Sequence, residues 1–268
     1  MTGMRYHSAE VADVDRYITD DSWAMEQKLD GIRCIATVDA DGHVTFSGHA
    51  GNPLRSSMKH HAPIAAELGT LRSIVVDGEL MADGHLWLFD ILAFADTNLR
   101  TFPFETRRAL LAQLDDVFDL VHVVPSATDV AAKTTLWAMV QATNGEGVVV
   151  KRLAGTYSAT GRSRDVLKIK VTKTIDVIVI GFGSGTDSAV LGLHRDGTLV
   201  EMGKCSLLGK PPVEIGDVIE VRYLYVVESD TPRLYQPRML RVRPDKSPVE
   251  CGWDQLDGAT TSKLVVAA

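Results

Sequence analysis

The sequence predicts an α+β fold in two parts, a domain built on antiparallel sheet followed by a small all-β barrel domain. Two observations lead to this expectation. Strand-like and helical runs are interspersed as far as Thr172, whereas only strand-like runs separated by turns follow it. A chain of 268 residues is also long enough for one or two domains with real cores. We therefore expect one domain at residues 1–172 and a second at residues 173–268.

In the first domain, alternating apolar and polar residues predict strands, and Asp-Gly pairs between several of them predict tight turns. The expected strands are residues 24–28, 32–38, 44–46, 73–81, 85–94, 121–124, 147–152 and 166–171. Helices are expected at residues 61–71, where Pro63 suits a first turn, and at residues 105–114 and 129–142.

In the second domain the pattern changes to short strands alone. The expected strands are residues 175–182, 189–194, 198–204, 217–227 and 234–242. A series of about five short strands separated by turns is typical of a small barrel.

The composition is ordinary for a soluble globular protein, with 45% hydrophobic and 24% charged residues. It excludes a disordered chain, a collagen and a disulfide scaffold. No apolar run approaches the roughly 18 residues that span a bilayer, so we expect no membrane partner. The three cysteines are widely spaced and odd in number, and the first residues do not resemble a signal peptide. Both features favour a reducing, cytoplasmic location.

The net charge of −7 argues weakly against a nucleic-acid partner. The distribution of charge matters more than its sum. Basic residues outnumber acidic ones at residues 146–170 and again at residues 230–246, in an otherwise acidic background. Each cluster lies beside a candidate motif.

The first candidate motif surrounds Lys28, which ends an expected strand before the turn Leu29-Asp30-Gly31. Glu26 precedes it by two residues and Arg33 begins the next strand. A positioned lysine amine can act as a nucleophile. For this segment alone, a solvated lysine on a surface hairpin is the simpler interpretation.

A second candidate is the pair of carboxylates in Val76-Asp77-Gly78-Glu79. Asp77 and Glu79 share one face of a strand, because side chains alternate along it. Such a pair needs donors or a cation, so it can bind a ribose hydroxyl or a hydrated Mg²⁺. In the next strand, Trp87 or Phe89 can stack on a base, although we expect at least one of these rings to pack in the core.

Two further segments carry clustered charge. Glu146 and Lys151 bound an apolar strand, while Lys168 and Lys170 share one strand face. Two like charges side by side repel unless an anion such as a triphosphate lies between them. After the last expected strand comes Arg243-Pro244-Asp245-Lys246. An exposed strand face and a polar exit from the barrel are the alternatives here.

Taken in order, these segments resemble the motifs of the covalent nucleotidyltransferases, and most closely those of a minimal, two-domain ATP-dependent DNA ligase. The matching segments are Lys28-Leu29-Asp30-Gly31-Ile32-Arg33, Asp77-Gly78-Glu79, Leu88-Phe89-Asp90, Glu146-Gly147-Val148-Val149-Val150-Lys151, Leu167-Lys168-Ile169-Lys170 and Arg243-Pro244-Asp245-Lys246. One such motif is weak evidence, but the ordered set is specific.

The resemblance implies an adenylation (nucleotidyltransferase) domain followed by an OB-fold domain. It implies that Lys28 attacks the α-phosphate of ATP and forms lysyl-AMP, which passes AMP to the 5′-phosphate of a DNA nick. The 3′-hydroxyl then displaces AMP. We therefore expect ATP with Mg²⁺ or Mn²⁺, nicked duplex DNA as the partner, and a monomer.

The resemblance also assigns roles to the other motif residues. It places Glu26 near the adenine amino group and stacks Phe89 on adenine. It implies nucleotide binding by Glu26, Lys28, Arg33, Glu79, Phe89, Glu146, Lys168 and Lys170, metal binding by Glu79 and Glu146, and catalysis by Lys28, Lys168, Lys170, Arg243 and Lys246.

One position departs from the family pattern. Many relatives carry Ser-Arg in the strand after the lysine motif, whereas Ser47 is followed here by Gly48. Arg55 is one candidate to replace that arginine, and a weaker DNA contact is the alternative. Together with the acidic net charge, this predicts modest, salt-sensitive DNA affinity.

Three other functions share some of these features. An mRNA-capping guanylyltransferase resembles the same motifs but uses GTP. An RNA ligase more often carries Asn at the position of Arg33 and often lacks the OB-fold domain. A non-catalytic OB-type nucleic-acid-binding module has no need of Lys28, Glu146 and Lys168 together.

Overall fold

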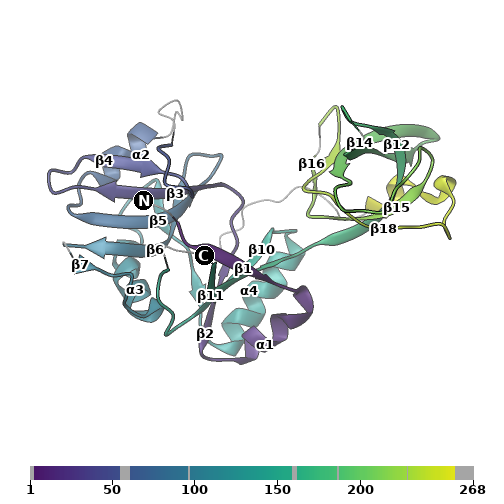
Figure 1. The fold of residues 1–268 in the computed structure, drawn as a ribbon. Helices are drawn as coiled ribbons and strands as arrows, with labels where there is room; N and C mark the ends of the chain where they lie inside the picture. The colour runs from purple at the N-terminus through teal and green to yellow at the C-terminus, as the bar shows by residue number, and fades with distance from the viewer. Residues whose placement is uncertain are drawn as a thin grey trace. The chain divides into compact units, whose positions relative to one another are not determined.

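The computed structural model describes residues 3–54, 61–95, 97–158, 162–185, 187–227 and 229–256. These residues form two compact units, shown in Figure 1. The first contains the described residues up to Gln141 together with Gly147–Lys170. The second contains Ala142–Glu146 and the described residues from Val171 onward.

Two sheets form the first unit (Figure 1). One has the order β1-β11-β10-β2-β9, and the other has the order β4-β3-β5-β6-β7, with β8 also paired to β6. The strands are β1 Arg5–Ala9, β2 Trp23–Gln27, β3 Ile32–Val38, β4 Val44–Ser47, β5 Ile74–Leu80, β6 Leu86–Phe94, β7 Thr97–Asn98, β8 Val121–Val123, β9 Ser126–Ala127, β10 Gly147–Arg152 and β11 Arg162–Lys170.

Both sheets are mixed, because β1 pairs with β11 and β8 pairs with β6 in parallel. The expectation of purely antiparallel sheet is therefore wrong at these two pairings. Strand β1 was not expected from the sequence, and its pairing with β11 joins segments more than 150 residues apart. Parallel strands are not joined by a hairpin turn, so no local turn pattern in the sequence predicts their pairing.

Helices pack against these sheets. They are α1 Val14–Thr19, α2 His61–Leu68, α3 Phe104–Leu111 and α4 Val130–Ala142, with short 3-10 turns at Val11–Asp13 and Ala112–Leu114. The three expected helices are confirmed, whereas α1 was not expected. The buried Lys133 of α4 donates to the carbonyls of Tyr17, Asp20 and Trp23, at 3.1, 2.9 and 3.2 Å. These contacts fix the end of the short α1, which is below the length of an independently stable helix.

The core of the first unit extends between its two sheets. Ile35, Val75 and Leu92 of one sheet cluster with Val149 and Val166 of the other. Residues on the neighbouring parts of these strands therefore lie between the two sheets. That arrangement positions the site described below.

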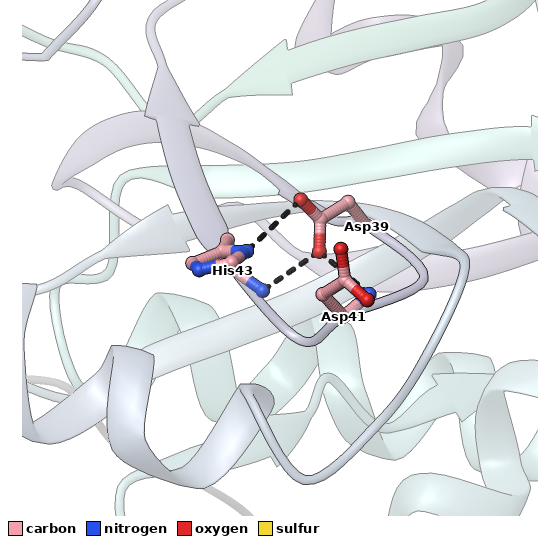
Figure 2. Close-up of side chains that lie close together, drawn as sticks. All are labelled: Asp39, Asp41 and His43. Atoms are coloured by element: carbon pink, nitrogen blue, oxygen red, sulfur yellow. Dashed lines mark hydrogen bonds and ion pairs between the residues drawn. The ribbon is translucent and has the colours of Figure 1, made fainter.

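The connection between β3 and β4 is a turn built by Asp39 (Figure 2). Its carboxylate accepts the backbone N–H groups of Asp41 and His43, at 3.0 and 2.8 Å. The His43 side chain lies 3.3 Å from the same carboxylate. The predicted Asp41-Gly42 turn is confirmed. Gly42 has φ 89°, and a Cβ there would collide with the Gly69 carbonyl, so this position requires glycine.

The second unit is a closed barrel of strand order β12-β13-β14-β18-β15 (Figure 1). Its elements are β12 Lys173–Phe182, β13 Ser188–Arg195, β14 Thr198–Ser206, β15 Val218–Tyr223, β16 Val226–Val227, β17 Arg233–Leu234, β18 Arg238–Val242, and 3-10 turns at Pro248–Glu250 and Trp253–Leu256. The predicted small barrel is confirmed. The expected strands 217–227 and 234–242 are each interrupted, and the short pair β16-β17 lies outside the barrel.

The barrel core contains the side chains of alternate strand residues, including Val177, Leu191, Ile219 and Met239, all fully buried. Leu256 joins this core, while residues 257–268 lie outside the described residues. Within the described ranges, none of the helices has the length and apolar character that a membrane span requires.

Candidate active site

A cavity of about 390 Å³ opens between the two sheets of the first unit. It is lined by Met4, Arg5, Tyr6, Glu26, Gln27, Lys28, Leu29, Arg33, His49, Glu79, Phe89, Val149, Lys151, Arg162 and Lys168. Six of the predicted site residues are among them: Glu26, Lys28, Arg33, Glu79, Phe89 and Lys168. The volume lies in the range of small-molecule sites.

Lys28 lies in the turn that joins β2 of one sheet to β3 of the other. Its backbone N–H donates to the Gly147 carbonyl at 2.9 Å, and its Nζ lies 3.4 Å from the Leu29 carbonyl. Gly31 donates to Glu79 Oε1 at 3.3 Å, and a Cβ at Gly31 would lie 2.5 Å from the Leu80 carbonyl. The turn is thus fixed from both sheets, which gives the Lys28 amine a defined position in the cavity.

Two of the lining residues form a buried ion pair. Lys151 Nζ lies 2.6 Å from Glu26 Oε2 and donates to the Phe89 carbonyl at 2.7 Å. Burial raises the pKa of the Glu26 carboxyl, and the Lys151 charge opposes that shift. Among the described residues, Glu26 Oε1 has no hydrogen-bond partner. A bound ligand with a hydrogen-bond donor would satisfy this buried acceptor.

Arg33 is held by Asp77 in a two-point ion pair. Its Nε and Nη2 lie 2.5 and 2.6 Å from the two carboxylate oxygens of Asp77. The Tyr157 hydroxyl donates to the same carboxylate at 2.6 Å and accepts the Met4 N–H at 2.9 Å. Asp77 is fully buried and committed to these partners. The proposal that Asp77 itself binds a ribose hydroxyl or Mg²⁺ is therefore wrong.

The two aromatic candidates separate as expected. Trp87 is buried against Leu29 and Val124, so its role is core packing. Phe89 lines the cavity, with the Arg33 guanidinium 4.5 Å and the Lys151 amine 5.0 Å from its ring centroid. Two cations that line the cavity therefore lie close to this ring.

The cavity is strongly positive. Six of its lining residues are basic and two are acidic, although the whole chain has a net charge of −7. Lys168 is on β11, as predicted, and lines the cavity, whereas Lys170 is not among the lining residues. Arg5 of β1 and Arg162 of β11 add positive charge, and neither was predicted as a site residue. Clustered cations of this kind suit an anionic ligand such as a polyphosphate.

Glu146, Arg243 and Lys246 belong to the second unit. Glu146 is buried, and its carbonyl accepts the Val171 N–H at 3.0 Å. Arg243 Nη1 and Lys246 Nζ both bind the Asp176 carboxylate, at 3.1 and 2.8 Å. Asp176 was not anticipated, although a lone carboxylate in the apolar run Ile175–Ile180 was a signal for it. That the three predicted residues gather around one nucleotide remains a prediction.

Metal binding by Glu79 and Glu146 also remains a prediction. Glu79 lines the cavity, and Glu146 lies in the other unit. In the described part of the chain, the turn residues Asp39, Asp41 and His43 are the group of three whose ligand atoms lie mutually within 4.8 Å (Figure 2). They are exposed, and their mutual hydrogen bonds account for their arrangement. Arg55, the suggested replacement for the missing arginine, lies outside the described residues.

Comparison with known families and proteins gives one consistent result. Residues 82–170 match the model of the ATP-dependent DNA ligase domain. The DNA ligase C1 of Mycolicibacterium smegmatis is 26% identical over 311 residues, which cover 88% of each chain. The multifunctional non-homologous end joining protein LigD of the same organism is 27% identical over 87% of this chain, which spans only 37% of that protein.

The fold comparison agrees. The crystal structure of the ligase domain of M. tuberculosis LigD matches 94% of this chain and 97% of its own, with a TM-score of 0.57 and 22% identity. At that identity the likeness concerns the fold. The family model covers the cavity residues Phe89, Val149, Lys151, Arg162 and Lys168 but does not extend to Lys28.

Proposed function

We propose that this chain, a member of the ATP-dependent DNA ligase family, joins the 5′-phosphate and 3′-hydroxyl of nicks in duplex DNA. The observation that carries the proposal is the position of Lys28. Its amine lies in a turn fixed by both sheets, at a cavity whose other charged residues are mostly cations. A nucleophile facing a cationic cavity is suited to attack a phosphate.

In the first step, the Lys28 amine attacks the α-phosphate of ATP. A P–N bond forms, the bond to the β-phosphate oxygen breaks, and pyrophosphate leaves. Lys168 and Phe89 both line the cavity, and we assign Lys168 to the charge on the phosphates and Phe89 to stacking on the base. The unpartnered Glu26 Oε1 supports adenine as that base, because it can accept from the 6-amino group and would repel the oxygen of guanine.

In the second step, an oxygen of the 5′-phosphate at the nick attacks the phosphorus of lysyl-AMP, and the P–N bond breaks. In the third step, the 3′-hydroxyl attacks the 5′-phosphate and AMP leaves. Arg33 and Glu79, on neighbouring strands of the cavity, are assigned to the ribose and the nick. The Asp77 carboxylate keeps the Arg33 guanidinium in one orientation.

The remaining parts of the proposal concern the second unit and the metal. The closed barrel is assigned as an OB-fold domain, with Arg243 and Lys246 orienting the pyrophosphate of ATP. A Mg²⁺ ion held by Glu79 and Glu146 would neutralise phosphate charge, as carboxylates commonly do together with substrate phosphates. We further propose that the enzyme acts as a monomer on nicked duplex DNA.

The test is sealing of a 5′-phosphorylated nick in the presence of ATP and Mg²⁺. We expect the wild-type chain and Lys210→Ala, which alters an exposed turn, to seal the nick, and Lys28→Ala to be inactive. The same proteins are incubated with α-labelled ATP or GTP to detect the nucleotidyl-lysine. Labelling by GTP, or sealing of RNA but not DNA, would move the assignment to a capping enzyme or an RNA ligase. Sealing by Lys28→Ala would overturn the mechanism.

A further inference from the structure

Two histidines from different elements meet in the sheet that contains β6 and β8. His85 directly precedes β6, and His122 is the central residue of β8. His85 Nδ1 lies 2.7 Å from His122 Nε2, and the two rings stack with their centroids 5.0 Å apart. Both residues are half-buried, so the pair borders solvent. The reaction proposed above uses neither of them.

The backbone around this histidine pair is fixed. The His85 N–H donates to Asp83 Oδ1 at 3.0 Å, and the His85 carbonyl accepts the Met81 N–H at 2.9 Å. The Leu86 N–H donates to the Leu120 carbonyl at 2.8 Å, which joins the start of β6 to the start of β8. These bonds hold both imidazoles at the same end of two parallel strands.

The surroundings of His122 favour a neutral ring and a nearby cation. Burial and the neighbouring His85 lower the pKa of the His122 imidazole. The charges of Glu67, Asp115 and Asp116 oppose that shift. An imidazole whose pKa lies below its usual value of about 6.5 is neutral at neutral pH, and the neutral ring is the form that binds metal ions. The three carboxylates add a negative potential that attracts a cation.

The distance between the two ring nitrogens is close to that of two ligands on one ion. Zinc–nitrogen bonds of about 2.0–2.1 Å at tetrahedral angles put two nitrogens about 3.3 Å apart, so a separation by a further ~0.6 Å suffices. The ring that donates the hydrogen bond then carries its proton on its other nitrogen, and both rings turn their lone pairs towards the ion. In the described part of the chain, no third imidazole, thiol or carboxylate lies within 4.8 Å of both nitrogens, so water would complete the coordination.

We infer that His85 and His122 form a binding site for one divalent transition-metal ion of the class of Zn²⁺, Ni²⁺ and Cu²⁺. Imidazole nitrogen suits these ions, whereas the Mg²⁺ proposed for the reaction prefers oxygen ligands. The histidine site therefore differs in its chemistry from the site proposed at Glu79 and Glu146. It also does not depend on the proposed ligase function.

Trp87 connects the histidine site to the cavity. The strand register pairs Trp87 of β6 with His122 on one side and with Glu79 of β5 on the other, so these side chains lie in one row on one face of the sheet. The Trp87 ring lies 4.6 Å from the His122 ring and packs against Leu29, the residue after Lys28. An ion bound to His122 therefore lies beside an indole whose fluorescence can report the binding.

The first experiment is calorimetric titration of the full chain with ZnCl₂, with Mg²⁺ in excess to occupy oxygen ligands. We expect the wild type to bind one Zn²⁺ ion more tightly than any other. His85→Gln and His122→Gln are each expected to weaken this binding by at least about tenfold, because a single imidazole cannot chelate the ion. The double variant should bind no more weakly than either single variant, since each substitution alone already removes the chelate.

His43→Gln is the matched control, because His43 belongs to the exposed group that it forms with Asp39 and Asp41. This variant is expected to keep the tightest Zn²⁺-binding event unchanged. Loss of that event in His43→Gln, or equal affinity in the wild type and both single variants of the pair, would overturn the inference. Losses that add up in the double variant would also overturn it, because they indicate two independent histidines.

A second experiment locates the ion by tryptophan fluorescence during titration with CuCl₂. Bound Cu²⁺ quenches a neighbouring indole, so we expect saturable quenching in the wild type that disappears in His85→Gln and in Trp87→Phe. The same quenching in Trp87→Phe would place the ion elsewhere and contradict the site. Thermal unfolding without metal checks that each variant is folded. His85 lies outside the strands, so His85→Gln provides the test even if His122→Gln does not fold.

Discussion

Lys151 Nζ lies 2.6 Å from Glu26 Oε2, and the two side chains are 3% and 2% exposed. The pair joins neighbouring strands β10 and β2, and both residues line the cavity. Lys151 also holds the Phe89 carbonyl, so one amine fixes both the carboxylate and the backbone of the ring assigned to adenine. We therefore expect this ion pair to contribute to the stability of the first unit.

Replacing Lys151 with Met is expected to destabilise the protein by about 3–5 kcal/mol, because it leaves the Glu26 charge buried without its cation. Urea unfolding followed by circular dichroism measures this loss. The double variant Glu26→Gln/Lys151→Met is expected to recover more than half of it, since no unpaired charge remains. If Lys151→Met and the double variant are both as stable as the wild type, the ion pair contributes nothing to the free energy of unfolding.

Much of the fold follows from local patterns. The turn at Lys28, the strands on both sides of it and the barrel strands were predicted because alternation and Asp-Gly turns are visible within a few residues. Parallel strand β1 was not, because Arg5-Tyr6-His7-Ser8-Ala9 carries little apolar signal and its partner is far along the chain. The cavity residues Arg5 and Tyr6 were missed with it.

In the site, too, local patterns were predictable and long-range contacts were not. Site residues inside short motifs were identified, whereas residues whose role depends on a partner from another strand were not. Asp77 was misassigned because Arg33, on the neighbouring strand β3, takes both of its carboxylate oxygens. Lys151 was given no role, although it points to the same strand face as Val149, the residue paired with Glu26. Strand register, which the sequence does not state, decides both cases.

Asp176 holds the two basic residues that follow the last barrel strand. Its carboxylate binds Arg243 and Lys246, and this hydrogen bond raises the pKa of the Lys246 amine. In Asp176→Asn the two cations lose the group that fixes their positions. We expect self-adenylation with labelled ATP to slow by about tenfold. Closing of a nick that already carries AMP should change far less, because no pyrophosphate leaves in that step.

A matched control for that variant is Glu220→Gln, which removes the carboxylate that binds Arg241 at 2.6 Å on the exposed barrel surface. Self-adenylation should be unaffected. If Asp176→Asn slows adenylation and nick closing to the same extent, Asp176 has only a structural role in the barrel.

The buried thiol of Cys34 predicts a loss of stability in alkali. Burial raises the pKa of Cys34 to about 12 from 9.0, and the charges of Asp77 and Glu79 add to this. The folded protein therefore keeps a proton that the unfolded chain releases above pH 9. This contribution is complete below pH 9 and is lost as the pH rises towards 12.

Between these values, the free energy of unfolding of the wild type should fall more steeply with pH than that of Cys34→Ala. The expected difference is about 1.4 kcal/mol per pH unit. Urea titrations of both proteins at several values between about pH 8 and about pH 11, a range around the ordinary thiol pKa, measure how steeply each free energy of unfolding changes with pH. Parallel curves would mean that the Cys34 thiolate is accommodated in the fold.

Salt should weaken the binding of nicked DNA steeply, even though the chain has a net charge of −7. The binding surface expected to matter is the cationic cavity rim with Arg5, Arg162 and Lys168, where phosphate contacts release counterions. The logarithm of the dissociation constant should rise linearly with the logarithm of salt concentration, and the slope should fall by about one in Arg162→Ala. Fluorescence anisotropy of a labelled nicked duplex over a salt series measures both slopes. Affinity and sealing that are the same at low and high salt would show that DNA is held mainly by uncharged contacts.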